Sequence, residues 1–279
     1  MKRQYNSSLI IFVIFFLSGG SALIYEGIWF HYAGLIVGNS VLAASTVISG
    51  FMAGLALGNF LMVRYGSSIS RSIETYLILE IIIGCFGIIS VILLPAMPSI
   101  MAPLFAITAE NPLIHNPVRF FTVFIVLLIP TTAMGMTLPL MVKHLTQLHG
   151  NFGQNLGRLY GWNTIGAVCG ILLSEFFLIE YFGLQRTGYI AALINFILAY
   201  VIYSRFKNEN LLDQFINNLK RASIEYKLPV VKLLVIAFIS GFSLLSLEII
   251  WFRFLLLSIS GTSEIFAIML ACVLAGIGR

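Results

Sequence analysis

Long apolar runs separated by short polar segments fill nearly the whole chain. Most of the runs reach the length of about 20 residues that a helix needs to cross a bilayer. Because the hydrocarbon core offers no water to backbone groups, such runs are predicted to be helices. The sequence therefore predicts an all-α, polytopic membrane protein with about eight transmembrane helices. The runs are 8–30, 41–63, 75–97, 118–142, 159–181, 187–204, 230–255 and 264–279.

One segment of the first run occurs twice. Residues 16–30 read FLSGGSALIYEGIWF and residues 238–252 read FISGFSLLSLEIIWF. Identical residues at equivalent positions include Ser18/Ser240, Ser21/Ser243, Glu26/Glu248, Trp29/Trp251 and Phe30/Phe252. An internal repeat marks the start of a second structural unit. The two copies begin the first and seventh predicted spans, so they run in parallel, as the two halves of major-facilitator transporters do.

The repeat and the polar segments divide the chain into three parts. We expect a first membrane unit of six helices at 1–204 and the start of a second, truncated membrane repeat at 230–279. The segment 205–229 between them is polar, with apolar residues at helical spacing, and is predicted to be an amphipathic linker on the cytoplasmic membrane surface. The incomplete second copy leaves open whether the chain is a full-length product or a fragment.

Composition and charge support the membrane assignment. The chain is 59% hydrophobic and 10% charged, whereas soluble domains carry about 25% charged residues. Its mean hydropathy is +0.99. The net charge of +5 does not indicate a nucleic-acid partner, because the basic residues lie between the apolar runs. Most of them fall at the amino end or in the even-numbered loops, which places the N-terminus in the cytoplasm.

Small and polar residues inside the runs predict close helix packing. Gly50, Gly54 and Gly58 form a small-xxx-small face, which lets two helices approach closely. Pro130 and Pro139 each remove a backbone donor, so a kink is expected in that helix. Asn163 suits a tight contact with an interhelical hydrogen bond. All of these features also fit plain structural packing.

Four glutamates lie inside the predicted spans: Glu26, Glu80, Glu175 and Glu248. An ionisable residue inside a bilayer is costly and marks a candidate functional site. Glu26 and Glu248 are repeat equivalents, and a pseudo-twofold axis would bring them together near the centre.

The glutamates have aromatic neighbours in the sequence, namely Tyr25, Trp29 and Trp251. Carboxylates and aromatic faces together attract amine cations. We therefore expect Glu26, Glu248 and Glu175, with these aromatic residues, to form a binding site for a cationic solute. Two alternatives stay open. Each glutamate could pair with Arg119, Arg186, Arg253 or His31 for structure alone, or a carboxyl group could carry a coupled proton.

Cysteine and histidine positions give no sign of a metal or cofactor site. Cys85, Cys169 and Cys272 lie inside predicted spans without metal-ligand spacing, and we interpret them as small packing residues. The segment GLALGN lies within an apolar run, so it does not form a nucleotide-binding glycine loop. We expect no metal and no cofactor.

Several of these motifs resemble a known family. FLSGGSALIYEGIW, GFMAGLALGN, PTTAMGMTLPL at 130–140 and GRLYGWNTIGAVCG at 157–170 resemble the membrane portion of bacterial spermidine-synthase-like membrane proteins. These are described as fused major-facilitator/spermidine synthase proteins. The resemblance implies a multi-pass protein of the bacterial inner membrane in a polyamine setting. It also implies a cytoplasmic aminopropyltransferase-like domain after the helices, and no such domain follows in this sequence.

Three functions remain open from the sequence. The chain binds or transports a small cationic, polyamine-like solute; or it is a non-catalytic anchor or subunit for a separate cytoplasmic synthase-like domain; or it is a fragment of a polyamine aminopropyltransferase. The bilayer is an expected partner, a small cation and such a domain are the two alternatives for a further one, and nucleic acid is not expected. Catalysis by this chain alone is not expected.

Overall fold

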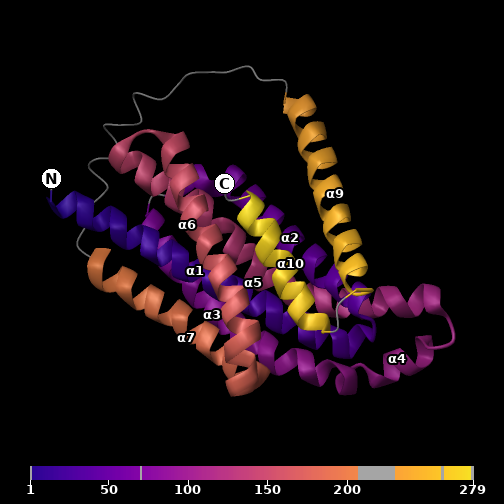
Figure 1. The fold of residues 1–279 in the computed structure, drawn as a ribbon. Coiled ribbons are helices and arrows are strands. Elements are labelled where there is room, and N and C mark those ends of the chain that lie inside the picture. Colours follow the sequence, from indigo (N-terminus) through magenta and orange to yellow (C-terminus); the bar gives the residue numbers. More distant parts are fainter. Residues whose placement is uncertain (1, 70, 207–229, 259–260, 278–279) are drawn as a thin grey trace.

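The computed structural model describes residues 2–69, 71–206, 230–258 and 261–277, and within these ranges every regular element is a helix (Figure 1). The elements are α1 (Lys2–Val37), α2 (Ser40–Tyr65), η1 (Gly66–Ser68), α3 (Ser72–Ile100), α4 (Ala102–Thr108), α5 (Pro112–His149), α6 (Phe152–Leu173), η2 (Ser174–Leu178), α7 (Ile179–Phe206), α9 (Val230–Leu255) and α10 (Thr262–Ile277). The prediction of an all-helical chain is confirmed for this part of the sequence.

Six helical stretches in the described ranges are long and apolar enough to cross a membrane. The sequence predicts about eight. One stretch, Phe152–Arg205, contains both of the runs predicted separately at 159–181 and 187–204. The last helix, α10, is shorter than a span requires. The number of spans therefore stays a prediction, while the membrane character of the chain does not depend on it.

Glycines with positive φ interrupt the helices, and Gly38 and Gly183 are two of them. Gly183 has φ 76° and ψ 167° inside the stretch assigned to α7, and so breaks the helix there. Gly38 has φ 75° between α1 and α2. Both values lie in a region that glycine enters without steric cost. After Gly38, the side chain of Asn39 caps α2 by accepting hydrogen bonds from the backbone N–H groups of Val41 and Leu42.

Helix α2 packs closely along α5 through its glycine face. A Cβ at Gly58 would collide with the carbonyl oxygen of Thr132 and lie 2.9 Å from the Cα of Gly135. A Cβ at Gly54 would collide with the side chain of Thr131, and one at Gly50 would lie 3.6 Å from Leu127. The predicted face thus lies at a helix contact, tightest toward its C-terminal end.

Helices α1 and α6 approach each other in the same way. A Cβ at Gly166 would overlap the backbone of Phe16, and one at Gly170 would overlap Gly20. Asn163 lies in this contact, with its Oδ1 2.8 Å from a Cβ placed on Gly19. Backbone proximity of this kind is typical of membrane helices, which lack a hydrophobic force between them.

Helix α5 continues through Pro130 and Pro139. Hydroxyl groups next to the first proline bond back to the preceding turn: Thr131 donates to the carbonyl of Leu127 at 2.6 Å, and Thr132 donates to that of Leu128 at 2.6 Å. Hydroxyl side chains in helices commonly bond back to the preceding turn in this way.

Basic side chains fix both ends of α5 to other elements. Near its start, Arg119 donates to the carbonyl of Val37 at the end of α1, at 3.2 Å. Near its end, Lys143 donates to the carbonyls of Gly66 and Ile69 at 2.7 and 2.6 Å. Cations are favourable where helix C-termini expose carbonyl groups.

Helix α9 stands at the edge of the bundle (Figure 1), and most of its side chains are exposed. Its inner side contacts the bundle through Glu248 and Phe252, and the Phe252 ring lies 5.8 Å from that of Phe30, its repeat equivalent. The repeat itself, and the division at 204 and 230, stay predictions. The predicted linker at 205–229 lies almost wholly outside the described residues.

Candidate binding cavity

A cavity of about 460 Å³ lies among the helices and receives side chains from α1, α2, α5, α6, α9 and α10. Apolar residues make up most of its wall. Its polar side chains are Ser18, Glu26, Asn59, Thr137, Tyr160, Asn163, Thr164 and Glu248. The size suits a small molecule, and a mostly apolar wall with a few convergent polar groups is typical of ligand sites.

Two carboxyl groups face this cavity. Glu26 of α1 is 1% exposed and Glu248 of α9 is 4% exposed. Both line the same cavity, so their like charges would repel each other if both were ionised. The Oε1 atom of Glu26 has no hydrogen-bond partner, and no residue that lines the cavity is basic. The structure thus brings together the two repeat-equivalent glutamates without a neutralising side chain.

The other polar side chains present both acceptors and donors to the cavity. Three hydroxyl groups already donate their single proton elsewhere: Ser18 to Oε1 of Glu80 at 2.8 Å, Thr137 to the carbonyl of Met134 at 2.7 Å and Thr164 to the carbonyl of Tyr160 at 2.8 Å. The Nδ2 atom of Asn59 donates to the carbonyl of Leu55 at 2.8 Å. A hydroxyl whose proton is used keeps only lone pairs. Tyr160 and Asn163 retain donors, and so does Asn59 through its second Nδ2 proton.

The aromatic residues predicted for the site lie elsewhere. Tyr25 and Trp29 are fully buried and stack with ring centroids 5.6 Å apart. The Trp29 indole N–H donates to the hydroxyl of Ser90 on α3 at 2.8 Å, and this bond holds the pair on the α3 side of α1. Trp251 is 54% exposed. None of the three lines the cavity, where the rings are those of Phe51 and Tyr160.

Glu175 also lies apart from the cavity wall. It belongs to the π-helical turn η2 and pairs with His31 of α1, with Oε2 and Nε2 3.1 Å apart. This is the structural pairing considered as an alternative for all the glutamates, and the structure shows it for Glu175. In the described residues, no ion pair involves Glu26 or Glu248.

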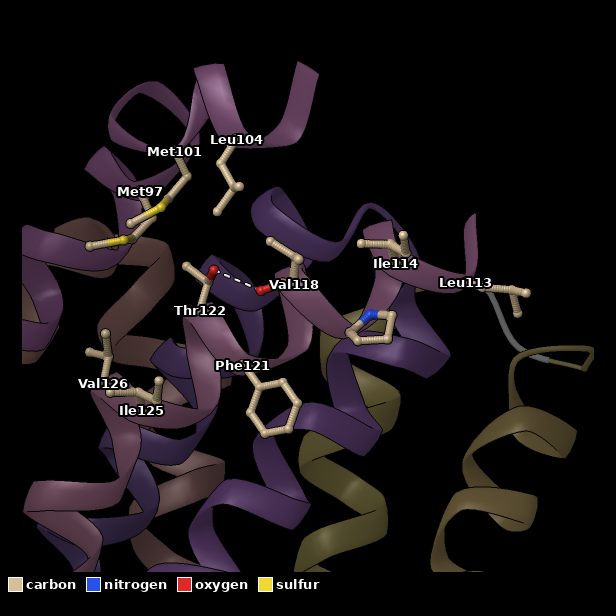
Figure 2. A pocket seen from close by; sticks show the side chains of 11 residues that line it. Met97, Met101, Leu104, Leu113, Ile114, Val118, Phe121, Thr122, Ile125 and Val126 are labelled. Atoms are coloured by element: carbon tan, nitrogen blue, oxygen red, sulfur yellow. Dashed lines mark hydrogen bonds between the residues drawn. The ribbon is translucent and has the colours of Figure 1, made fainter. Parts of the chain in front are cut away.

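A second pocket, of about 650 Å³, lies between the end of α3, α4 and the start of α5 (Figure 2). Its labelled side chains are apolar except for Thr122, whose hydroxyl donates to the carbonyl of Val118 at 2.8 Å. No charged residue lines it. A cation would lose hydration there without compensation, so the first cavity is the candidate site.

Sequence reasoning missed Ser18, Asn59, Thr137, Tyr160 and Thr164 as cavity residues. One signal pointed to Ser18: it is identical to Ser240 in the repeated segment and precedes Glu26 on the same helix. The other residues come from α2, α5 and α6, and only the packing of these helices brings them to the cavity.

Comparison with known proteins gives a distant similarity. The chain is 26% identical over 204 residues to "Polyamine aminopropyltransferase 2" of Ralstonia nicotianae, a match that covers 73% of this chain and 37% of that protein. It is also 26% identical over 204 residues to "Polyamine aminopropyltransferase 1" of the same organism, with 73% and 36% covered. The chain therefore spans little more than a third of the length of these curated relatives. No family model and no solved structure matches it.

Proposed function

We propose that this chain is a membrane module that binds a small cationic solute of the polyamine type in the cavity formed by Glu26 and Glu248. The two facing carboxyl groups carry the proposal. Two carboxylates that repel each other are both stabilised by a positive charge placed between them. An ammonium group supplies that charge and a hydrogen bond to Oε1 of Glu26, which has no other partner.

The other polar side chains of the cavity wall also favour an ammonium group as ligand. Because Ser18, Thr137 and Thr164 donate their protons within the protein, they offer lone pairs to a ligand. An ammonium group has three donors and no acceptor, so it fits these lone pairs. A carboxylate or phosphate would find repulsion from Glu26 and Glu248. Phe51 and Tyr160 add aromatic faces that attract cations.

The distant relatives support the polyamine class. Their names describe transfer of an aminopropyl group to polyamines, and polyamines carry several ammonium groups linked by apolar methylenes. A mostly apolar cavity with separated acceptors matches that alternation. We extend the proposal to passage of the solute across a bacterial inner membrane, with the N-terminus in the cytoplasm.

The same similarity favours a second function. The matched region is little more than a third of each relative, so the chain could serve as the membrane anchor or subunit of a cytoplasmic synthase-like domain, or as a piece of a polyamine aminopropyltransferase. In these cases the helices would hold the enzyme at the membrane, and the cavity need not bind a polyamine.

Direct binding separates the two functions. The purified protein in lipid nanodiscs is titrated with putrescine and with spermidine, and wild type is compared with Glu26→Gln/Glu248→Gln. We expect saturable binding in wild type and a loss of at least about tenfold in affinity in the double variant, because each neutralised carboxylate removes a charge-assisted hydrogen bond. Glu180→Gln, at an exposed glutamate of α7, is the matched control.

The outcomes point in different directions. Binding that the double variant loses and the control keeps supports the cation site. Absence of binding in folded wild-type protein favours the anchor or subunit function. Binding unchanged in the double variant would exclude Glu26 and Glu248 as the site.

A further inference from the structure

Glu80 of α3 is a fully buried carboxyl group outside the lining of the cavity. Its Oε1 accepts a hydrogen bond from the Ser18 hydroxyl at 2.8 Å, and its Oε2 accepts one from Nδ2 of Asn195 on α7 at 2.9 Å. The ion pairs found in the described ranges involve Glu74 and Glu175, and none involves Glu80. Two neutral donors thus hold a single carboxyl group inside the membrane-spanning part of the protein.

The hydrogen-bonding groups around Glu80 in the described residues are neutral side chains. Tyr25 of α1 and Tyr76 of α3 lie within electrostatic reach of it and are fully buried. The Tyr25 hydroxyl and Oδ1 of Asn195 have no hydrogen-bond partner. Helix α5 also packs on α3. No ion pair within the described residues involves Glu80, so a proton is the candidate to neutralise this carboxylate.

Ser18 connects this carboxyl group with the cavity. Its hydroxyl lies on the cavity wall and donates to Glu80. While Glu80 is ionised, Ser18 therefore presents only lone pairs to a ligand, which favours an ammonium group. When Glu80 is protonated, its O–H can donate to Ser18 Oγ. The Ser18 proton then turns toward the cavity, where it repels an ammonium group.

We propose that Glu80 is a proton-carrying group of this membrane module and that Ser18 couples its protonation to the binding of a cation in the cavity. The inference rests on the cation-binding function proposed above. It concerns a different carboxyl group and a second species, the proton. Ionisable residues inside membrane helices form proton relays in pumps and transporters, and here the relay has one hydroxyl between the cavity and the acid.

The proton transfer balances as follows. A hydronium ion in the cavity gives a proton to Ser18 Oγ and becomes water, while the original Ser18 hydroxyl proton passes to Oε1 of Glu80. One O–H bond forms on Glu80, and Ser18 exchanges one O–H bond for another. The reverse transfer accompanies entry of the cation. One proton therefore leaves Glu80 for each cation bound.

The first test needs no ligand. Infrared difference spectra of the protein in nanodiscs, recorded between about pH 5 and about pH 9, detect the C=O stretch of a protonated carboxyl group. We expect a pH-dependent band that Glu80→Gln removes and Ser18→Ala shifts, because Ser18 bonds to the same carboxyl group. Ser21→Ala is the matched control, since Ser21 donates to the carbonyl of Ser18 and not to Glu80. If Glu80→Gln removes no pH-dependent band, Glu80 does not change its protonation and the proposal is wrong.

The second test uses spermidine as the probe. Calorimetric titration in buffers of different ionisation enthalpy gives the number of protons released per spermidine bound. We expect Glu80→Gln to bind spermidine but to release about one proton fewer than wild type. The spermidine affinity of wild type should then change by about tenfold per pH unit through this proton, and the affinity of Glu80→Gln should not. Ser18→Ala should reduce the release, and Ser21→Ala should not.

The two proposals can fail separately. If wild type binds no spermidine, the cation-binding function fails, and the coupling proposal fails with it even if the infrared band shows that Glu80 titrates. If wild type and Glu80→Gln bind spermidine and release equal numbers of protons, the cavity binds the cation and the coupling proposal alone is overturned.

Discussion

Trp29 and Trp251 occupy equivalent positions of the repeated segment but differ in their surroundings. Trp29 is fully buried, stacks on Tyr25 and donates to Ser90. Trp251 is 54% exposed. Both follow a glutamate three residues earlier, so the local pattern is the same. The difference arises because α3 packs against α1, whereas in the described chain the corresponding side of α9 has no such neighbour.

This difference predicts unequal effects of one substitution. Trp29→Phe should lower the free energy of unfolding by about 1 to 3 kcal/mol, because it leaves the Ser90 hydroxyl without its indole donor and reduces packing. Trp251→Phe should change it by less than about 0.5 kcal/mol. Thermal unfolding in detergent, followed by intrinsic fluorescence, measures both. Equal effects would contradict the burial of Trp29.

The four intramembrane glutamates could be found from the sequence, but their partners could not. A carboxyl group in an apolar run is informative because its burial is costly, and all four were identified from the sequence. Their roles depend on partners far along the chain. Glu175 meets His31, Glu80 meets Ser18 and Asn195, and Oε1 of Glu26 meets none. Side-chain partners of this kind follow from helix packing rather than from local spacing.

At the level of helices, the glycine pattern of α2 predicted a close contact but not the helix that makes it. In the structure this helix is α5. Its Gly135 faces the α2 backbone, and a Cβ on Gly135 would lie 2.7 Å from the Cα of Leu55. Two small residues facing each other bring the helix backbones close together. A pattern of small residues gives the face of one helix, but the second helix could be any that has a matching face.

Gly58→Ala should therefore be destabilising by about 1 to 3 kcal/mol, because its methyl group would collide with backbone atoms of α5 that cannot move independently. The matched control is Gly34→Ala in α1, where a Cβ meets no atom within 4 Å. That substitution should be neutral or slightly stabilising, since alanine favours the helix. Unfolding in detergent compares the two. A harmless Gly58→Ala would show that α2 and α5 are further apart than described.

At the level of the whole molecule, the distribution of basic residues predicts the orientation in the membrane. The N-terminus and the turn after α2 should face the cytoplasm, and the turn between α4 and α5 should face outward. Lys143, which contacts Gly66 and Ile69 after α2, belongs to the predicted cytoplasmic side. Arg119, which contacts Val37, belongs to the other side.

Labelling of single cysteines tests this orientation. In a background without Cys85, Cys169 and Cys272, the exposed residues Glu110 and Ser67 are replaced by cysteine. A membrane-impermeant maleimide added to intact cells should label Glu110→Cys, which lies before α5, and leave Ser67→Cys unlabelled until the cells are opened. The reverse pattern would invert the proposed topology.

A helical, membrane-like chain was predictable from the long apolar runs alone, because in a bilayer each such run must satisfy its own backbone groups, as a helix does. The sequence also identified Glu26 and Glu248 as related positions, since the repeat is a property of the residues alone. Which side chains share a cavity became clear only from the packing of the helices. Tyr25 and Trp29 lie beside Glu26 in the chain but turn to α3, while Thr137 and Thr164 come to the cavity from α5 and α6. The apolar surfaces of membrane helices resemble one another, so partners are selected by close fit of small residues and by a few buried hydrogen bonds.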